Sequence, residues 1–426
     1  MKASSRSFPR IIRDRARRKK WVFNGKKNKS GRPAPSPSGT SKKPLWRFAE
    51  DGRVSFFRNR PRPLPEPDFR SVADALNDAL ERPETIRFPF GINGADSAGV
   101  HVVPADAMPT GSVWFLGDVH GDYPALLASC AFILNRDPDA VLCFCGDVVD
   151  RGPDSLKCVL YILDMLLRRP GKVLWLRGNH EDALKFDEEE GRFRSSVKPA
   201  GFADLLNGHA GYAAFGRNLL RFIRLLPSAV FLPDGLLFTH AGIPMGDLLP
   251  KLASIQDLNQ SKALFDFCWV RIEPDKEYKK VSRVSRGVSA GRVNIDEFFL
   301  KCGELGIRAN RIVAGHEHPE NGFSRFEGLS ELDGPRYPRC QCLKSALILH
   351  NSAIAETGPG DAQPFAVARY RANETPEVKV LYFKSSVFDA LNKHSRSEPE
   401  QKPELDVTSL PDSGQPKQSE QSEQLK

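Results

Sequence analysis

Five potential metal ligands in this sequence share one setting, because each follows a short run of apolar residues after one or two intervening residues. They are Asp118, Asp147, Asn179, His240 and His316. Each alone has an ordinary explanation, since Gly-Asp is a common turn, Asn-His can cap a helix and a single histidine is more often a hydrogen-bonded core residue. Together they offer carboxylate, amide and imidazole ligands without a thiolate, a set that suits Mn²⁺, Fe or Zn²⁺. The pattern therefore favours one metal site assembled from five loops.

The apolar runs before these ligands have the length and composition of β-strands that are buried on both faces. Helical patterns lie between the runs, from Pro124 to Leu134 and from Ser155 to Leu167. The first three ligands are 29 and 32 residues apart, as successive β-α-β units require. In a layered α/β fold, ligands bind beyond the carboxyl ends of the strands. The fold would therefore gather all five side chains in one place.

Charge is distributed unevenly along the chain. The 426 residues carry 62 Lys+Arg and 53 Asp+Glu, a formal net charge of +9. Residues 1–63 hold 20 Lys+Arg against 3 Asp+Glu, a net charge of +17, which leaves 42 against 50 and a net of −8 for the rest. A basic arm on a mildly acidic body usually contacts phosphate, nucleic acid or another polyanion.

Composition divides the chain further. The arm combines Lys and Arg with Pro, Ser and Gly, so it cannot bury enough apolar surface to fold. Apolar residues recur at helical spacing between Glu66 and Leu80, which predicts an amphipathic helix packed on the domain that follows. The predicted segments are a basic disordered arm (1–63), a helical lead-in (64–110), the folded domain (111–390) and a disordered polar tail (391–426).

The eight cysteines and the hydropathy pattern bear on the compartment. Most of the thiols stand among apolar residues, and neither Cys143/Cys145 nor Cys340/Cys342 has the spacing of a zinc ribbon. We therefore expect reduced thiols. No apolar run reaches the roughly 18 to 20 residues of a membrane-spanning helix, and Asp14 argues against a transit peptide. These features predict a cytoplasmic protein without a membrane span.

Three strings of the sequence carry a family resemblance. Gly117-Asp-Val-His-Gly121, Gly146-Asp-Val-Val-Asp-Arg-Gly152 and Gly178-Asn-His-Glu181 resemble, in order and spacing, the signature motifs of the phosphoprotein phosphatases, the PPP-type serine/threonine phosphatases. This family lies within the calcineurin-like metallophosphoesterase superfamily. Similar strings follow, and the likeness runs from about residue 113 to residue 320, continuing through 365–370. The further strings are Thr239-His-Ala-Gly242, Ser285-Arg-Gly-Val-Ser289 and Ala314-Gly-His-Glu317.

The resemblance implies an α/β fold, a metallophosphoesterase-type β-sandwich flanked by helices, with disordered tails. It also implies two divalent metal ions, most readily Mn²⁺, with Fe or Zn²⁺ as alternatives. A hydroxide that bridges the ions would attack the phosphorus in line, without a covalent phosphoenzyme. By motif position, the ligands would be Asp118, His120 and Asp147 for one ion, and Asp147, Asn179, His240 and His316 for the other.

The resemblance assigns roles to four further residues. His180 would protonate the leaving alkoxide, and Asp150 would orient its imidazole. Arg151 and Arg286 would bind the phosphoryl oxygens, because guanidinium groups match that geometry. The ordinary alternative for both arginines is a structural salt bridge.

The sequence departs from the eukaryotic members in two places. The string Leu349-His-Asn-Ser-Ala-Ile354 replaces a segment that ends in tyrosine, so the resemblance does not predict an aromatic contact near the metals here. His318 resembles the second histidine of the Gly-His-x-His motif of the wider superfamily, and it could be a further ligand, a neighbour of the ligands or a surface residue. The remaining histidines lack a motif, and we expect them to be structural or exposed. They are His101, His209, His350 and His394.

Three functions are compatible with these features. The first is a metal-dependent phosphomonoester hydrolase that acts on phosphoserine or phosphothreonine in a phosphoprotein. The second is hydrolysis of diadenosine polyphosphates or other nucleotides, because small members of the same family share the three motifs. The third is a polyanion-binding protein whose phosphatase fold is idle, although the intact ligand set argues against this reading. Because substrate choice depends on the loops around the metals, the motifs do not separate the first two.

Overall fold

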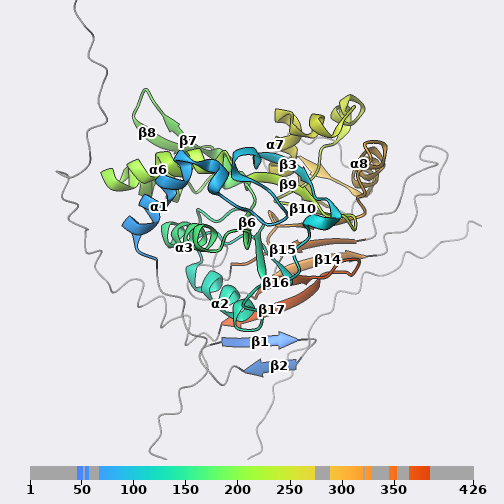
Figure 1. Cartoon of the computed structure of the whole chain (residues 1–426), viewed down its shortest axis with the longest axis horizontal. Helices are drawn as coiled ribbons and strands as arrows, with labels where there is room; N and C mark the ends of the chain where they lie inside the picture. The colour runs from blue at the N-terminus through green and yellow to red at the C-terminus, as the bar shows by residue number, and fades with distance from the viewer. Residues whose placement is uncertain are drawn as a thin grey trace, which may run out of the picture. The chain divides into compact units, whose positions relative to one another are not determined.

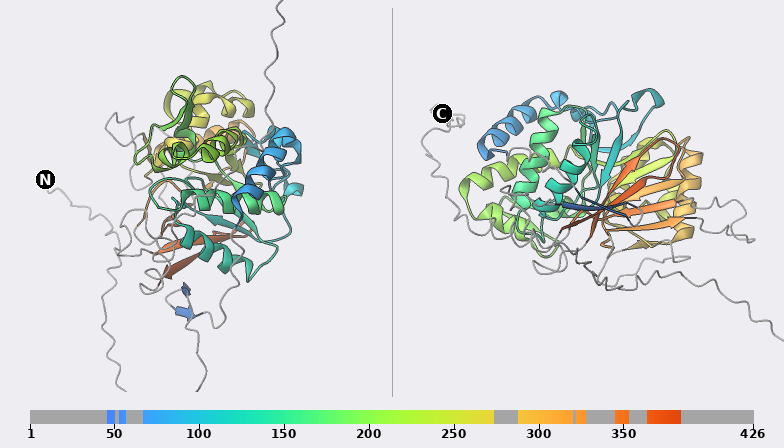
Figure 2. Two further views of the ribbon diagram at one scale, coloured as in Figure 1. Left: turned by 90° about the vertical axis from the view of Figure 1, so that its left-hand side faces the viewer. Right: turned by 90° about the horizontal axis from the view of Figure 1, so that it is seen from below.

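The structure is a computed structural model, which describes residues 46–50, 53–56, 67–273, 288–319, 322–327, 345–352 and 364–383. Within these ranges two β-sheets form the centre, and helices pack on both sides of them (Figures 1 and 2). The predicted α/β sandwich flanked by helices is therefore confirmed. Every apolar run that precedes a predicted ligand forms a strand.

The first sheet has seven strands. Strands β4, β5 and β6, at one end of the sheet, are parallel to one another, and β16 pairs antiparallel with β4. All residues of β4, β5 and β6 are buried, as expected for strands covered on both faces. In spatial order the strands are β2 (Arg53–Phe56), β1 (Trp46–Glu50), β17 (Glu377–Phe383), β16 (Phe365–Tyr370), β4 (Val113–Leu116), β5 (Val141–Phe144) and β6 (Val173–Trp175).

The second sheet has six strands, and it packs face to face on the first. The rings of Phe115 in β4 and Phe238 in β10 lie 4.7 Å apart between the two sheets. β10, β13 and β15 are parallel, so their carboxyl ends point the same way. In spatial order the strands are β14 (Phe323–Glu327), β15 (Ser345–Leu349), β13 (Arg311–Ala314), β10 (Leu236–Thr239), β9 (Pro227–Phe231) and β3 (Gly99–Val102).

Helices cover the outer faces of the sandwich. α1, α2, α3, α5 and α6 contribute to one large apolar core with both sheets, whereas α7 and α8 form a second core on the outer face of the six-stranded sheet (Figure 1). The helices are α1 (Phe69–Glu81), α2 (Tyr123–Leu134), α3 (Ser155–Arg168), α4 (Asn179–Ala183), α5 (Gly201–Asn207), α6 (Ala210–Ile223), α7 (Ser261–Trp269) and α8 (Arg292–Glu304).

Short elements complete the described ranges. Two small two-stranded sheets, β7–β8 and β11–β12, border the loops at the strand ends. Their strands are β7 (Leu184–Asp187), β8 (Arg192–Ser195), β11 (Arg271–Ile272) and β12 (Ser289–Ala290). The 3-10 helices are η1 (Pro83–Thr85), η2 (Gly94–Asp96), η3 (Ala105–Ala107), η4 (Gly246–Lys251) and η5 (Ile255–Asn259).

Helix α1 confirms the amphipathic pattern seen in the sequence. The side chain of Asp68 caps it by accepting a hydrogen bond of 2.8 Å from the backbone N–H of Ser71. The apolar face of the helix is buried, and the ring of Phe69 lies 5.4 Å from the rings of Tyr212 and Phe215 in α6. The helix therefore packs on the domain, as expected.

Two segment boundaries differ from those predicted. β1 and β2 lie inside the arm that was expected to be disordered, and β1 pairs with β17. In the sequence, Asp51-Gly52 stands between the paired residues Glu50 and Arg53, and this dipeptide favours tight hairpins. Likewise, β3 lies inside the lead-in yet belongs to the second sheet, paired with β9. The disorder predicted for the rest of the arm and for residues 391–426 concerns residues outside the described ranges.

The described helices and cysteines bear on the remaining predictions. In the described ranges no helix is both long and apolar enough to cross a membrane. The six cysteines there are buried and unpaired: Cys130, Cys143, Cys145, Cys158, Cys268 and Cys302. Cys340 and Cys342 lie outside the described residues.

Candidate metal centre

Loops at the carboxyl ends of the strands carry the predicted ligands to one place. Asp118 and His120 follow β4, and Asp147 follows β5. β6 leads into α4, whose first residue is Asn179, while β10 and β13 end just before His240 and His316. All six side chains are buried, with exposed fractions of 9% or less. The two sheets thus contribute to a single buried cluster.

The backbone of these loops is strained where the ligands lie. Five residues of the cluster and its border have φ between +47° and +67°, a conformation that costs non-glycine residues about 1–2 kcal/mol each. Such strain persists only where surrounding contacts impose it, and it gathers at functional sites. The five are His120, Asp147, Asp150, Arg151 and His316.

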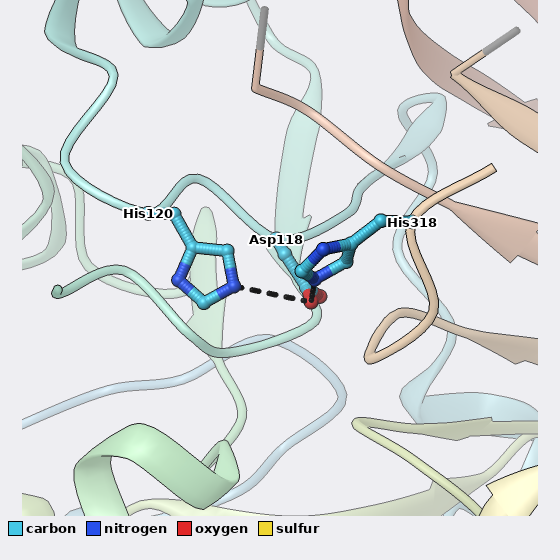
Figure 3. Close-up of side chains that lie close together, drawn as sticks. All are labelled: Asp118, His120 and His318. Atoms are coloured by element: carbon cyan, nitrogen blue, oxygen red, sulfur yellow. Dashed lines mark ion pairs between the residues drawn. The ribbon is translucent and has the colours of Figure 1, made fainter. Parts of the chain in front are cut away.

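Asp118 lies at one end of the cluster. The Nε2 atom of His120 is 3.7 Å from Oδ2 of Asp118 and 3.7 Å from Oδ2 of Asp147. The Nε2 atom of His318 approaches the same Asp118 oxygen to 3.5 Å. Figure 3 shows the two imidazole rings on either side of the Asp118 carboxylate. Asp118, His120 and His318 therefore present three ligand atoms within 4.8 Å of one another.

Asn179 lies at the other end of the cluster. Its Oδ1 atom is 3.0 Å from Nε2 of His240 and 2.9 Å from Nδ1 of His316. Nε2 of His240 is also 3.5 Å from Oδ1 of Asp147. Asp147 reaches both ends of the cluster, since its other oxygen faces His120. This is the position that a bridging carboxylate would need.

The donor atoms fit a pair of divalent cations. His120 Nε2 is buried, and among the described residues it has no hydrogen-bond partner, which is costly unless another group binds it. Its Nδ1 lies 3.0 Å from the carbonyl oxygen of Val149, and Nδ1 of His240 lies 2.9 Å from that of Cys145. Backbone carbonyls commonly orient metal-binding histidines in this way, leaving Nε2 as the donor.

The electrostatics favour charged carboxylates and neutral imidazoles. Burial alone would raise the pKa of Asp118, but the hydrogen bond with His318 and the neighbouring His240 and His120 hold this pKa well below its usual value. Burial lowers the pKa of His120 and His316. Neutral imidazole and ionised carboxylate are the forms that bind metal.

His180 and Asp150 form a hydrogen-bonded pair beside the cluster. Nδ1 of His180 lies 2.8 Å from Oδ2 of Asp150, whose other oxygen accepts a hydrogen bond from the backbone N–H of Phe202. Although burial lowers the pKa of His180, the carboxylates of Asp147 and Asp150 outweigh it, so the net shift is upward. The imidazole is therefore held in one orientation with Nε2 left for chemistry.

A cavity of about 710 Å³ adjoins this arrangement. The buried residues Asn179, His180 and His316 line it, as does the exposed residue Arg151. Arg151 NH1 also lies 3.0 Å from Nδ1 of His318. The predicted anion-binding residue Arg286 lies outside the described residues.

The cavity reveals a guanidinium group that sequence reasoning missed. Arg271 lines the cavity and donates a 2.8 Å hydrogen bond to Glu317, the residue after His316. The cavity wall also carries Phe265 and Trp269, whose rings are stacked at 5.4 Å and 9°. Asp182 accepts the indole N–H of Trp269 at 2.9 Å. Arg271, Phe265 and Trp269 belong to no quoted motif, and only the fold brings them to the site.

The structure also shows where His318 and His350 lie. The role of His318 was left open by the sequence, and His350 was expected to be structural or exposed. His318 belongs to the cluster, since its side chain is only 11% exposed and faces Asp118. His350 is 2% exposed and stacks on His318, with ring centroids 4.5 Å apart and an interplanar angle of 25°. His350 lies in the string 349–354, which was compared with a family segment near the metals, but it was itself expected to be structural or exposed.

A sandwich of two sheets whose strand ends gather carboxylates and histidines beside a cavity could hold metal ions at that edge. Residues 111–320 match the family described as calcineurin-like phosphoesterase. This matched region, 210 of the 426 residues, is similar to calcineurin-like phosphoesterases and contains all six predicted ligands.

Solved structures of phosphatases are also similar to this chain. A protein serine/threonine phosphatase from Saccharomyces cerevisiae with similarity to human phosphatase PP5 is 17% identical, covers 75% of this chain and 90% of its own, and has a TM-score of 0.49. The cold-active protein-tyrosine phosphatase of a psychrophilic Shewanella species is 19% identical. The match covers 66% of this chain and 81% of the phosphatase chain, with a TM-score of 0.35.

Proposed function

We propose that this protein is a PPP-type serine/threonine protein phosphatase, a metal-dependent phosphomonoester hydrolase. One observation carries the proposal: six potential ligands from five loops lie in one buried cluster, and two of them, Asn179 and His316, line a cavity together with His180 and Arg151. The three motifs that resemble the PPP-type enzymes supply these residues except His240 and His316, which come from the further strings 239–242 and 314–317. Because the thiols in the described ranges are reduced and buried, we further place the protein in the cytoplasm.

Two divalent ions, with Mn²⁺ favoured over Fe and Zn²⁺, are the proposed cofactors. When bound, such a pair activates water and neutralises charge on the phosphoryl oxygens. The residues proposed to hold one ion are Asp118, His120 and Asp147, and those for the other are Asp147, Asn179, His240 and His316.

The residues of the chain complete the proposed mechanism. His180 donates a proton from Nε2 to the leaving alkoxide, and Asp150 fixes the ring through Nδ1 at 2.8 Å. Arg151 binds phosphoryl oxygens in the cavity. Arg286 has the same proposed role by its motif. Arg271 is a further anion-binding group, because its guanidinium lies in the cavity beside His316.

Hydrolysis of diadenosine polyphosphates is the second candidate function. The stacked pair Phe265 and Trp269 favours it, because Phe265 is 48% exposed and could receive a nucleobase. The same surface could also receive an apolar residue beside a phosphoserine. The polyanion contact proposed for the basic arm is compatible with either substrate, and an idle fold is disfavoured by the complete set of ligands.

A substrate panel tests the proposal. The protein is loaded with Mn²⁺, its metal content is measured, and kcat/KM is determined for phosphoserine, phosphothreonine and phosphotyrosine peptides beside diadenosine tetraphosphate. We expect two ions per chain and the highest kcat/KM on a phosphoserine or phosphothreonine peptide. A preference for the dinucleotide would replace the first candidate by the second, and absence of hydrolysis with both ions bound would reject both.

A further inference from the structure

We propose that His350 is a positioning residue, which holds the imidazole of His318 against Asp118 so that His318 serves the ion bound by Asp118 and His120. The inference rests on the proposed metal centre, and it adds a residue that comes from another strand and from no recognised motif. Three features carry it: a fixed backbone at His350, a stacked pair of rings, and the direction in which His318 points.

The backbone of His350 is tied on several sides. It follows β15 and forms a parallel bridge with Asp118, at the end of β4 in the other sheet. Its N–H donates a 2.8 Å hydrogen bond to the carbonyl oxygen of Gly322, and its own carbonyl oxygen accepts one of 2.9 Å from Ala366. The ring of His350 therefore occupies a place set by both sheets, and it is 2% exposed.

The stack determines the plane of the His318 ring. The two imidazoles lie 4.5 Å apart at 25°, whereas His318 meets the ring of His120 edge to face at 5.2 Å and 75°. With one face covered by His350 and an edge against His120, the ring of His318 has little freedom to rotate away. Stacked and edge-to-face rings are both favourable arrangements at these distances.

Both nitrogens of His318 then point at groups of the site. Nε2 lies 3.5 Å from Oδ2 of Asp118 (Figure 3), and Nδ1 lies 3.0 Å from NH1 of Arg151. Because a guanidinium only donates, Nδ1 accepts in this contact; an ion on Nε2 would place the ring proton on Nδ1 and replace the contact with Arg151. If the plane of the ring were not fixed, the contact with Asp118 would loosen. Residues that orient metal ligands commonly change metal affinity 10- to 100-fold when they are replaced.

Two variants of similar volume separate stacking from simple packing. His350→Leu fills the space without a planar ring, whereas His350→Phe keeps a planar ring without nitrogens. The probe is Co²⁺ alone, titrated into the metal-free full chain and followed by its visible absorption, with circular dichroism to check folding. We expect His350→Leu to lower the affinity for one of the bound Co²⁺ ions about 10-fold or more and to change the Co²⁺ absorption spectrum. His350→Phe should restore the affinity and the spectrum to near those of the wild type.

A double-mutant cycle shows whether His350 acts through His318. In a His318→Ala background, His350→Leu should have little further effect, because the oriented ring is already absent. His101→Leu serves as a control, since this histidine lies in β3 and is proposed to have no part in the centre; it should leave Co²⁺ binding unchanged.

Several results would overturn the inference. Wild-type Co²⁺ affinity and spectrum in a folded His350→Leu would do so, and so would an equal effect of this change with and without His318. Failure of His350→Phe to restore binding would reject stacking as the cause. A wild-type chain that binds no Co²⁺ would instead refute the metal centre of the proposed function, so the two failures are distinguishable.

Discussion

At the scale of single residues, Asp147 and His180 are proposed to have separable tasks. Asp147→Asn removes the charge shared by both ends of the cluster, so we expect loss of bound metal together with loss of activity. His180→Asn leaves the ligands intact, so metal should stay bound while turnover of an alkyl phosphate falls about 10²- to 10⁴-fold. An aryl phosphate, which has a better leaving group, should lose less. Metal analysis combined with steady-state rates checks both variants, and normal metal content and rates in both would contradict the assignment.

Arg271 is the second residue whose role can be measured. Replacing it by Ala removes a guanidinium from the cavity, and a hydrogen bond to a charged group contributes about 1.5–3 kcal/mol. We therefore expect kcat/KM for a phosphopeptide to fall about 10- to 100-fold. Arg221→Ala is the matched control, because Arg221 lies on α6 and pairs with Glu81 at the surface. Equal rates in the two variants would show that Arg271 is only half of a salt bridge with Glu317.

The sequence predicted the residues that stand in local patterns and missed those that do not. Asp118, Asp147 and His240 follow apolar strands, and this pattern alone placed them at strand ends. Arg271 has no such pattern around it, and His350 follows the apolar run 346–349 but was expected to be structural or exposed. They reach the site only because β11 borders the cavity and β15 ends beside β4, which are contacts between distant parts of the chain.

At the scale of elements, the close approach of the two sheets depends on Gly117. A Cβ atom at this position would overlap the carbonyl group of Leu349, the last residue of β15. Gly117→Ala should therefore lower the free energy of unfolding by several kcal/mol, as strand β4 is forced away from β15. Gly303→Ala is the matched control, since a Cβ there meets nothing within 4 Å on helix α8. Because Ala favours helix over Gly, this control should gain up to about 1 kcal/mol. Urea unfolding measures both, and a stable Gly117→Ala protein would contradict the packing.

Helix α7 carries a carboxyl group that should weaken the fold at neutral pH. Burial raises the pKa of Asp266 to about 6, only partly offset by Lys262, and Oδ2 of Asp266 has no hydrogen-bond partner among the described residues. Because the folded-state pKa lies above the unfolded value, the folded state binds more protons between about pH 4 and pH 6. The carboxylate therefore costs stability above this window, and the cost disappears as the pH falls through it.

Asp266→Asn tests this sign. The neutral amide should make the metal-free protein more stable than the wild type at pH 7, by on the order of 1–2 kcal/mol. The difference should vanish near pH 4, where the wild-type carboxyl group is protonated. Urea unfolding at a series of pH values measures it, and a variant that is less stable than the wild type at pH 7 would contradict the prediction.

Elements were predicted well where periodicity was strong. α1 follows from the spacing of Val72, Leu76 and Leu80, and β4, β5 and β6 follow from uninterrupted apolar runs. β1 and β2 were missed because the surrounding Lys, Arg and Pro dominated the composition, although Asp51-Gly52 stands between two alternating runs. The Asp51-Gly52 turn dipeptide therefore predicted these two strands better than the net charge of the segment did.

At the scale of the whole molecule, the basic N-terminal segment and the catalytic domain are proposed to act independently. Residues 1–42 carry 14 Lys+Arg against 1 Asp+Glu, and β1 begins after them. Deleting residues 1–42 should leave turnover of a small aryl phosphate unchanged, because the deletion spares both sheets. Binding to single-stranded DNA should weaken strongly at low salt, and the slope of log affinity against log salt should become shallower, since fewer counterions are released.

A longer deletion separates the two parts of the predicted arm. Removing residues 1–63 also takes away β1, which pairs with β17 from Trp46 opposite Phe383 to Ala49 opposite Val380. This exposes the edge of a seven-stranded sheet, so the longer deletion should lower the unfolding midpoint and favour aggregation, whereas the shorter one should not. Equal midpoints for the two deletions would show that β1 adds nothing to the sheet. Loss of aryl phosphate turnover in the shorter deletion would show instead that residues 1–42 belong to the catalytic domain.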